Sequence, residues 1–363
     1  MVQKIIYWLL LSLILSIGFG QLLRFDFYGL PLFIHDILVG VLLTLSAVEL
    51  AKNYKVRNFV IPLWLKLFLT GLVIGYLRAM SLYPIISLLA PSLYGIRILM
   101  YLTLYLFLKT KKIQIPKTVY ILSGVIALVI GLFQYMTIPD MRIFQYLGWD
   151  DHLNRLTLPH FDPTFSGVML GLFALWLINI KFSYKAILLA LSSLAIMLTN
   201  SRSVWVSLML TAVMMIKNKG YLLLIIATIF IAAIALPKRF GEGNNLFRTY
   251  SISSRIQSDF SYIKKYKWEF GFGRGMNTLV LDQSATAREN HATGPNNSYL
   301  YLLLTTGVIG FAGWSLFMYT LFKSSSYKPM LAFFFVTSLF NNVMFYPFAL
   351  LWILLIQATE NKT

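Results

Sequence analysis

The chain has 363 residues, of which 58% are hydrophobic and only 12% charged, and this composition excludes an ordinary soluble domain. Lysine and arginine outnumber aspartate and glutamate by 31 to 13. In a membrane protein, the resulting net charge of +18 favours membrane lipids and phosphates as partners over nucleic acid. The absence of cysteine excludes disulfide bonds and thiolate chemistry.

Apolar runs recur from Ile5 to Ile356, most of them near the length of about 20 residues that a transmembrane helix requires. Inside a membrane each backbone amide must bond within its own segment, so these runs are predicted to be helices. The sequence therefore predicts an all-α polytopic integral membrane protein with about 12 transmembrane helices, in a single membrane domain over residues 1–363. The expected spans are 5–22, 30–50, 59–77, 84–108, 118–138, 161–180, 186–199, 204–216, 221–236, 298–322, 329–341 and 342–357.

Charged residues divide the short connections between these spans into two sets. One set carries almost only lysine, and the positive-inside rule places it in the cytoplasm together with both termini. The other set carries arginine and no lysine, and the large loop of residues 237–297 falls on the same outer side. The lysine set includes Lys4, Lys52, Lys109, Lys117, Lys185, Lys219 and Lys323, and the arginine set is Arg24, Arg78, Arg142, Arg155 and Arg202.

Arginine on the outer side predicts an anion site. Its planar guanidinium binds two phosphate oxygens at once, whereas lysine acts as a point charge. Arg97, which lies inside a span, and further arginines in the large loop support this interpretation. The alternative is that single arginines only reach the phosphates of membrane lipids.

The large loop contains a predicted amphipathic helix over residues 251–270, which is expected to lie along the membrane surface. Gly271 is expected to end this helix, and Gly273 and Gly275 to adopt positive φ in the turn that follows. The turn either presents backbone amides to an anion or only returns the chain. The apolar stripe of the helix consists of Ile252, Ile256, Phe260 and Ile263.

Four motifs follow one another between residues 150 and 320. They are Asn154-Arg155-Leu156-Thr157 with Phe161-Asp162-Pro163, then Thr199-Asn200-Ser201-Arg202-Ser203, then Arg255 with Trp268 and the glycine turn, and finally Asn297-Ser298-Tyr299-Leu300 with Gly307 and Gly310. In this order and placement, the set resembles the O-antigen ligase and O-antigen polymerase superfamily of bacterial envelope glycosyltransferases. The hydropathy pattern fits the same superfamily along the whole chain.

The resemblance implies glycan transfer in lipopolysaccharide biosynthesis, at the outer face of the bacterial inner membrane, with the large loop in the periplasm. An undecaprenyl-diphosphate-linked oligosaccharide repeat unit would be the donor and a sugar hydroxyl the acceptor, with a flippase and a chain-length regulator as further partners. The ligases carry a histidine at the position of Asn296, so this chain is more similar to a polymerase. A ligase that transfers glycan to lipid A-core remains the alternative.

This chemistry needs positive charge at the departing diphosphate and a group that orients or deprotonates the acceptor hydroxyl. Arg202 and Arg255 match the superfamily motifs and are the predicted catalytic arginines. His291 and Asn296 are the predicted catalytic partners of the hydroxyl, with Glu289 and Asp282 as alternative bases. The residues expected to bind substrate are Arg155, Arg248, Arg274, Asn297, Tyr299 and Asp162.

The reaction is predicted to need neither a metal nor another cofactor, because the sequence has no Asp-x-Asp motif and arginine can supply the charge. Asp150-Asp151-His152 is interpreted as an acidic turn rather than a metal cluster. Asp162 precedes a proline at the start of a span, so helix capping is as plausible there as function. His35 and Asp36 are expected to cap the second span and to pair with Arg24.

A non-enzymatic alternative is a lipid-linked oligosaccharide flippase or an anion transporter. A transporter would place charges near the middle of the membrane and would show internal repeats. In this sequence the charges gather at the outer boundary and no repeat is evident, so a transferase is favoured.

Overall fold

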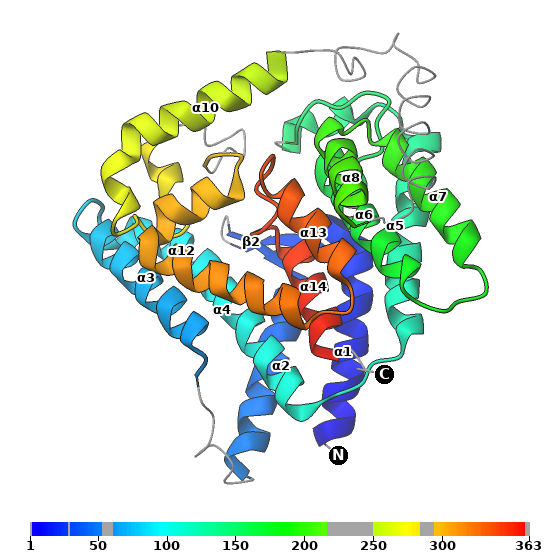
Figure 1. The fold of residues 1–363 in the computed structure, drawn as a ribbon, viewed down its shortest axis with the longest axis horizontal. Coiled ribbons are helices and arrows are strands. Elements are labelled where there is room, and N and C mark those ends of the chain that lie inside the picture. The colour runs from blue at the N-terminus through cyan, green and yellow to red at the C-terminus, as the bar shows by residue number, and fades with distance from the viewer. Residues whose placement is uncertain are drawn as a thin grey trace.

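The computed structural model describes residues 2–27, 30–52, 61–147, 149–215, 250–283 and 294–359 (Figure 1). Regular structure in these ranges is almost entirely helical, apart from an antiparallel hairpin of β1 (Arg24–Phe27) and β2 (Leu30–Phe33). The α-helices are α1 (Val2–Phe19), α2 (Ile34–Lys52), α3 (Leu63–Met80), α4 (Ile85–Lys111), α5 (Lys117–Thr137), α6 (Pro163–Ile178), α7 (Lys185–Leu198), α8 (Arg202–Met215), α10 (Tyr250–Tyr266), α12 (Ser298–Ser324), α13 (Lys328–Thr337) and α14 (Pro347–Thr359). Short 3-10 helices are η1 (Gly20–Leu23), η3 (Met141–Leu147), η5 (Lys267–Phe270) and η6 (Thr278–Asp282).

Each expected span within the described residues corresponds to one of these helices, whereas the expected span 221–236 lies outside them. Five helical segments are long and apolar enough to cross a membrane, so the prediction of a helical membrane protein is confirmed at that level. They are Val2–Leu23, α3, α4, α5 and α12, while α6, α7, α8, α13 and α14 are apolar but shorter. The expected number of about 12 spans, residues 237–297 as an outer loop, and the orientation remain predictions.

Proline and capping side chains determine where several helices begin. Pro62, Pro84 and Pro116 stand immediately before α3, α4 and α5. Proline is compatible with a helix start because the first amides of a helix have no intrahelical partner. The helix predicted over residues 251–270 is confirmed, with α10 continued by η5.

Helices α3 and α12 meet along a seam of glycines. A Cβ atom placed on Gly71 of α3 would lie 2.4 Å from the Cα atom of Gly310 on α12. One placed on Gly313 would lie 2.4 Å from the backbone nitrogen of Phe68. Small residues let two helix backbones approach closely, and this packing is a main source of helix association in membranes.

Because backbone atoms line this seam, Gly71→Ala is expected to lower the free energy of unfolding by about 1–3 kcal/mol, the usual range for an overpacked core. The measurement is the melting temperature of the purified protein in detergent. Gly40→Ala on α2 is the control, since its added methyl would first meet the flexible end of Met100 at 3.6 Å. Equal melting temperatures for the two variants would contradict the close packing of α3 against α12 at Gly71.

The helix ends gather into two groups. The starts of α1, α5 and α13 and the ends of α6 and α14 surround a cavity of about 350 Å³ that includes Tyr7, Lys117 and Tyr327. The opposite helix ends surround a larger cavity of about 550 Å³ that includes Arg24, Arg97 and Arg255. Lys117, from the lysine-bearing connections, thus lies at the first cavity, and Arg24, from the arginine-bearing connections, lies at the second.

Candidate functional site

The larger cavity lies between α10, the segments that lead into α6 and α12, the β1–β2 hairpin, α4 and the turn between α13 and α14. Its wall combines guanidinium groups, side-chain amides, carboxylates and aromatic rings. This combination suits a ligand that carries both anionic and sugar groups. The polar lining includes Gln21, Arg24, Arg97, Asp150, Asp162, Arg255, Asn277, Asn296, Asn341 and Asn342, and the aromatic lining includes Tyr94, Trp149, Phe161, Phe165, Tyr262, Tyr301 and Tyr346.

Arg255, a predicted catalytic residue, reaches this wall from α10. Its Nη1 donates to the carbonyl oxygen of Phe340 at 3.1 Å and to Oδ1 of Asn341 at 2.8 Å. Nδ2 of Asn341 in turn donates to Oγ of Ser203 at 2.9 Å. Hydrogen bonds thus join the motif around Arg255 to the motif that contains Arg202.

Arg202 stands at the first residue of α8, next to Ser203, and is not among the cavity-lining residues. Arg155, predicted to bind substrate, instead binds protein backbone: its Nε donates to the carbonyl of Thr199 at 2.9 Å and its Nη2 to that of Asn200 at 3.2 Å. These bonds hold the end of α7, where Asn200 has a φ of 50°. Arg155 therefore orients the segment that precedes Arg202.

Residues of the fourth motif divide between the cavity and helix capping. Asn296, predicted to be catalytic, lines the cavity. Asn297, predicted to bind substrate, caps α12, and its Oδ1 accepts from the amides of Tyr299 at 2.9 Å and Leu300 at 3.2 Å. The hydroxyl of Tyr299 donates to the carbonyl of Phe335 at 3.1 Å, outside the cavity lining. The structure thus gives Asn297 and Tyr299 roles in holding α12 in place.

Asp162 caps a helix and also lies at the cavity. Its Oδ1 accepts from the amides of Thr164 at 2.6 Å and Phe165 at 2.9 Å, which confirms it as the cap of α6. It also lines the cavity. Thr164 and Phe165, whose amides Asp162 caps, also line the cavity, so the first turn of α6 lies against it.

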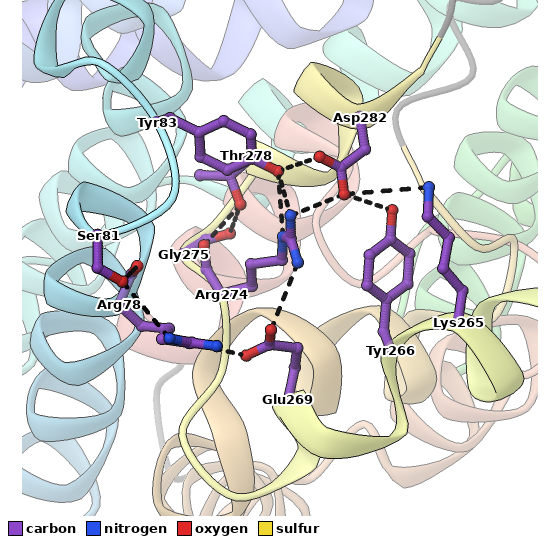
Figure 2. A network of polar contacts seen from close by, with 10 residues as sticks. All are labelled: Arg78, Ser81, Tyr83, Lys265, Tyr266, Glu269, Arg274, Gly275, Thr278 and Asp282. Carbon is purple, nitrogen blue, oxygen red and sulfur yellow. Dashed lines mark hydrogen bonds and ion pairs between the residues drawn. The ribbon is translucent and has the colours of Figure 1, made fainter.

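Arg274, predicted to bind substrate, belongs to a separate polar network (Figure 2). Its Nη2 lies 2.8 Å from Oδ2 of Asp282 and 2.6 Å from the hydroxyl of Tyr83, and its Nη1 lies 3.4 Å from Oε1 of Glu269. Arg78 meets the same Glu269 at 3.4 Å. Arg274 is therefore paired with two carboxylates and is not among the cavity-lining residues, and its predicted role in binding substrate stays a prediction.

The same network argues against Asp282 as a base. Burial opposes the charged form of Asp282, yet hydrogen bonds from Tyr83 and Tyr266 and the charges of Arg274 and Lys265 hold its pKa below the ordinary value. The hydroxyl of Tyr266 donates to Oδ2 at 2.8 Å. A carboxylate held in this way is a poor proton acceptor.

The glycine turn after η5 follows the predicted conformation, with φ of 77° at Gly273 and 87° at Gly275. Its amides are used within the protein: that of Gly273 donates to the carbonyl of Glu269 at 2.8 Å, and that of Gly275 to the carbonyl of Thr305 at 2.8 Å. The turn packs against Gly307, where α12 bends at a φ of 64°. With both glycine amides already bonded, the structure favours the second of the two interpretations, a turn that only returns the chain.

Asp36 pairs with Arg97 rather than with Arg24. Arg97 Nε donates to Oδ1 of Asp36 at 2.9 Å and Nη2 to Oδ2 at 2.7 Å, and Tyr101 donates to Oδ1 at 2.8 Å. Arg24 lies in β1 and pairs with Asp26 at 2.9 Å. The predicted pair was wrong because the hairpin, absent from the sequence-based prediction, directs Arg24 toward its own strand.

Two aromatic stacks form much of the remaining wall. Trp149 stacks on Phe161 with ring centres 4.6 Å apart, and Arg24 lies over Trp149 at 5.5 Å. Phe165 stacks on Tyr346 at 4.0 Å.

Two predicted site residues, Arg248 and His291, lie outside the described residues, as does the alternative base Glu289. Their predicted roles stay predictions from the sequence.

Asp150, His152 and Asp162 form a group that could hold a cation. One ligand atom from each lies within 4.8 Å of the other two. The sequence-based interpretation of residues 150–152 as an acidic turn did not include Asp162, which the start of α6 brings to the group. Burial lowers the pKa of His152, so its imidazole is neutral and able to act as a ligand near pH 7.

We nevertheless expect EDTA not to inhibit the protein, because Oδ1 of Asp162 is committed to the α6 amides and arginine supplies positive charge in the cavity. The measurement is product formation after dialysis against EDTA, with and without added Mg²⁺, Mn²⁺ or Ca²⁺. In Asp150→Asn, which weakens any cation site, EDTA should likewise leave the rate of the variant unchanged. Inhibition that Mg²⁺ reverses in the wild type would contradict the prediction.

No protein-family model and no curated protein matches the sequence. The basis for a function is therefore the position of the motif residues. Arg255, Asn296 and Asp162 meet at the cavity, and Arg155 and Arg202 lie behind its wall.

Proposed function

We propose that the protein is a membrane glycosyltransferase of the O-antigen polymerase type. It would transfer undecaprenyl-diphosphate-linked oligosaccharide repeat units to a sugar hydroxyl at the outer face of the bacterial inner membrane. The observation that carries the proposal is the cavity of about 550 Å³ at the arginine-bearing end of the bundle, which three arginines and two aromatic stacks line.

The chemistry of such a transfer fits this lining. Cleavage of the bond between the anomeric carbon and the lipid diphosphate places negative charge on the departing phosphate, and fixed cations stabilise that charge. Arg255 and Arg24 are the cations we assign to it, since the pair of Arg97 with Asp36 is buried, whereas Arg24 pairs only with the exposed Asp26. The Trp149–Phe161 and Phe165–Tyr346 stacks provide flat apolar surfaces for sugar rings.

Helix α10 supports access of a lipid-linked donor. Arg255, Ser258 and Tyr262 face the cavity, whereas Ile256 and Phe260 are 51% and 66% exposed on the other side. Such an amphipathic helix lies in the boundary between head groups and acyl chains. A donor whose polyprenyl chain stays in the membrane would then have its diphosphate close to the cavity.

Asn296 favours a polymerase over a ligase. It lines the cavity at the position where the resemblance implies a histidine in ligases, and its amide can orient a hydroxyl without removing a proton. A ligase that uses lipid A-core as acceptor is the second candidate. A transporter is less favoured because the cavity lies among helix ends, whereas transporters bind substrate near the middle of the membrane.

Purified protein in detergent or nanodiscs, supplied with a lipid-linked repeat unit, tests the proposal. A ladder of lipid-linked oligomers without any core acceptor is the expected result. A single transfer that needs lipid A-core would indicate a ligase instead. Passage of the intact donor across a liposome membrane without bond formation would indicate a transporter and contradict the proposal.

A further inference from the structure

Asp259 follows Ser258 on α10, one helical turn after Arg255 and less than one turn before Tyr262; it is not itself among the residues that line the cavity but lies directly beside them. Ser258 and Tyr262 both line the cavity. Its carboxylate accepts hydrogen bonds from the backbone amides of Asn296 and Asn297, where the chain enters α12. It is therefore fixed between the two elements that carry Arg255 and Asn296.

One oxygen of this carboxylate has no partner. Oδ1 of Asp259 is buried, and none of the residues that the structure describes forms a hydrogen bond to it. Buried polar atoms nearly always have partners, because leaving water without a replacement bond is destabilising. An orphaned carboxylate oxygen beside a cavity is therefore a position where a ligand hydroxyl would restore the missing bond.

Two nearby carboxylates are already engaged. Oδ1 of Asp162, which lines the cavity, caps α6, and Asp36 binds Arg97 and Tyr101. An aspartate four residues after an arginine on a helix ordinarily forms an exposed ion pair, so the sequence alone does not single out Asp259. In the structure, Nη1 of Arg255 is directed to Phe340 and Asn341 instead.

The electrostatic surroundings agree with this geometry. Burial raises the pKa of Asp259 above its ordinary value, and it outweighs the amides of Asn296 and Asn297 and the charge of Arg255, which act in the opposite direction. Tyr262 on α10 is the other titratable group that interacts with it, while the α12 side contributes only amides. A carboxylate with a raised pKa takes up a proton more readily.

We propose that Asp259 is the general base of the glycosyl transfer, an inference that rests on the proposed function. The acceptor hydroxyl oxygen forms a bond to the anomeric carbon of the donor, and its proton passes to Oδ1 of Asp259. The bond from that carbon to the diphosphate oxygen breaks, and the electron pair leaves with the polyprenyl diphosphate. Arg255, one turn away, faces the same cavity and stabilises the departing charge.

Asp259→Asn tests the proposal, because an amide oxygen still accepts from the Asn296 and Asn297 amides but cannot take up a proton. We expect the rate of transfer to fall by about 10²–10⁴, with the KM for the donor unchanged. Asp259→Glu should retain part of the activity. Asp140→Asn, in an exposed pair with Arg142 outside the cavity, is the matched control and should be as active as the wild type.

The pH profile gives a readout that a structural role would not move. In the wild type the rate should decrease as pH falls through the pKa of Asp259, since the protonated carboxyl cannot accept a proton, and Asp259→Asn should lose this acidic limb. A wild-type profile without the limb overturns the proposal even if the variant fails to fold. If Asp259→Asn is fully active, or if its rate still decreases at low pH, Asp259 is not the general base, although the protein can still be a glycosyltransferase. Absence of product from the wild type overturns the glycosyltransferase itself.

Discussion

Arg255→Ala is expected to lower the rate of glycan transfer by about 10²–10³, the usual loss when one group that stabilises transition-state charge is removed. The guanidinium lines the cavity, and its Nη1 bonds to Phe340 and Asn341 fix its position before substrate binds. Such a prepositioned cation needs no reorganisation when the diphosphate departs. The measurement is the initial rate of oligomer formation from the lipid-linked repeat unit.

Two further variants separate charge, geometry and position. Arg255→Lys keeps the charge but loses the planar fork, so it should recover only part of the rate. Arg142→Ala removes an arginine on the same end of the bundle that pairs with Asp140 outside the cavity, and it should act like the wild type. Wild-type rates in Arg255→Ala, with melting temperature unchanged, would remove Arg255 from the site.

Arg202→Ala distinguishes a direct from an indirect role. Sequence resemblance predicts that it abolishes product, although Arg202 stands behind the wall at the start of α8. Loss of activity with unchanged donor KM and unchanged melting temperature would support the predicted role. Wild-type activity in Arg202→Ala would mean that the motif around Arg202 has only a structural role, through the hydrogen bond between Ser203 and Asn341.

Arg97→Met is expected to lower the free energy of unfolding by about 3–5 kcal/mol, the usual result of removing one partner of a buried ion pair. Arg97 and Asp36 are only 14% and 13% exposed, and two bonds of 2.9 and 2.7 Å join them. Without Arg97 the carboxylate of Asp36 remains buried, with Tyr101 and the amide of Phe33 as hydrogen-bond donors. The measurement is thermal unfolding in detergent.

Arg24→Met is the matched control for this prediction. Arg24 also lines the cavity, but its partner Asp26 is 59% exposed, so the loss should be only about 0–1 kcal/mol. The double variant Arg97→Met/Asp36→Asn should regain part of the stability, because the uncompensated charge is gone. Equal melting temperatures for Arg97→Met and Arg24→Met would contradict the pairing.

The helices could be predicted from the sequence because each apolar run has to bond its own backbone in a membrane, and because prolines and caps mark the starts. Pro62, Pro84 and Asp162 are examples of such marks. The β1–β2 hairpin could not be predicted in this way. Its strands are four residues long and lie next to an apolar run, so residues 30–33 were taken into the second span.

Sequence motifs located the site but did not assign its residues. The order of the motifs placed Arg255, Asn296 and Asp162 at one cavity. Motif resemblance could not separate residues that line the cavity from residues that support it. Arg155, for example, binds the carbonyl of Thr199, 44 residues further along the chain, and Arg274 binds the hydroxyl of Tyr83, 191 residues before it. Whether a charged side chain binds another protein group or can bind a ligand depends on contacts between segments that are far apart in the sequence.

Photo-crosslinking with a polyprenyl diphosphate that carries a photoreactive group next to the diphosphate would test the central claim most directly. The claim predicts adducts on cavity residues such as Tyr94, Trp149 and Tyr262, reduced by excess unlabelled donor and by Arg255→Ala. Adducts confined to the smaller cavity around Lys117, or spread evenly over lipid-facing helices, would contradict it.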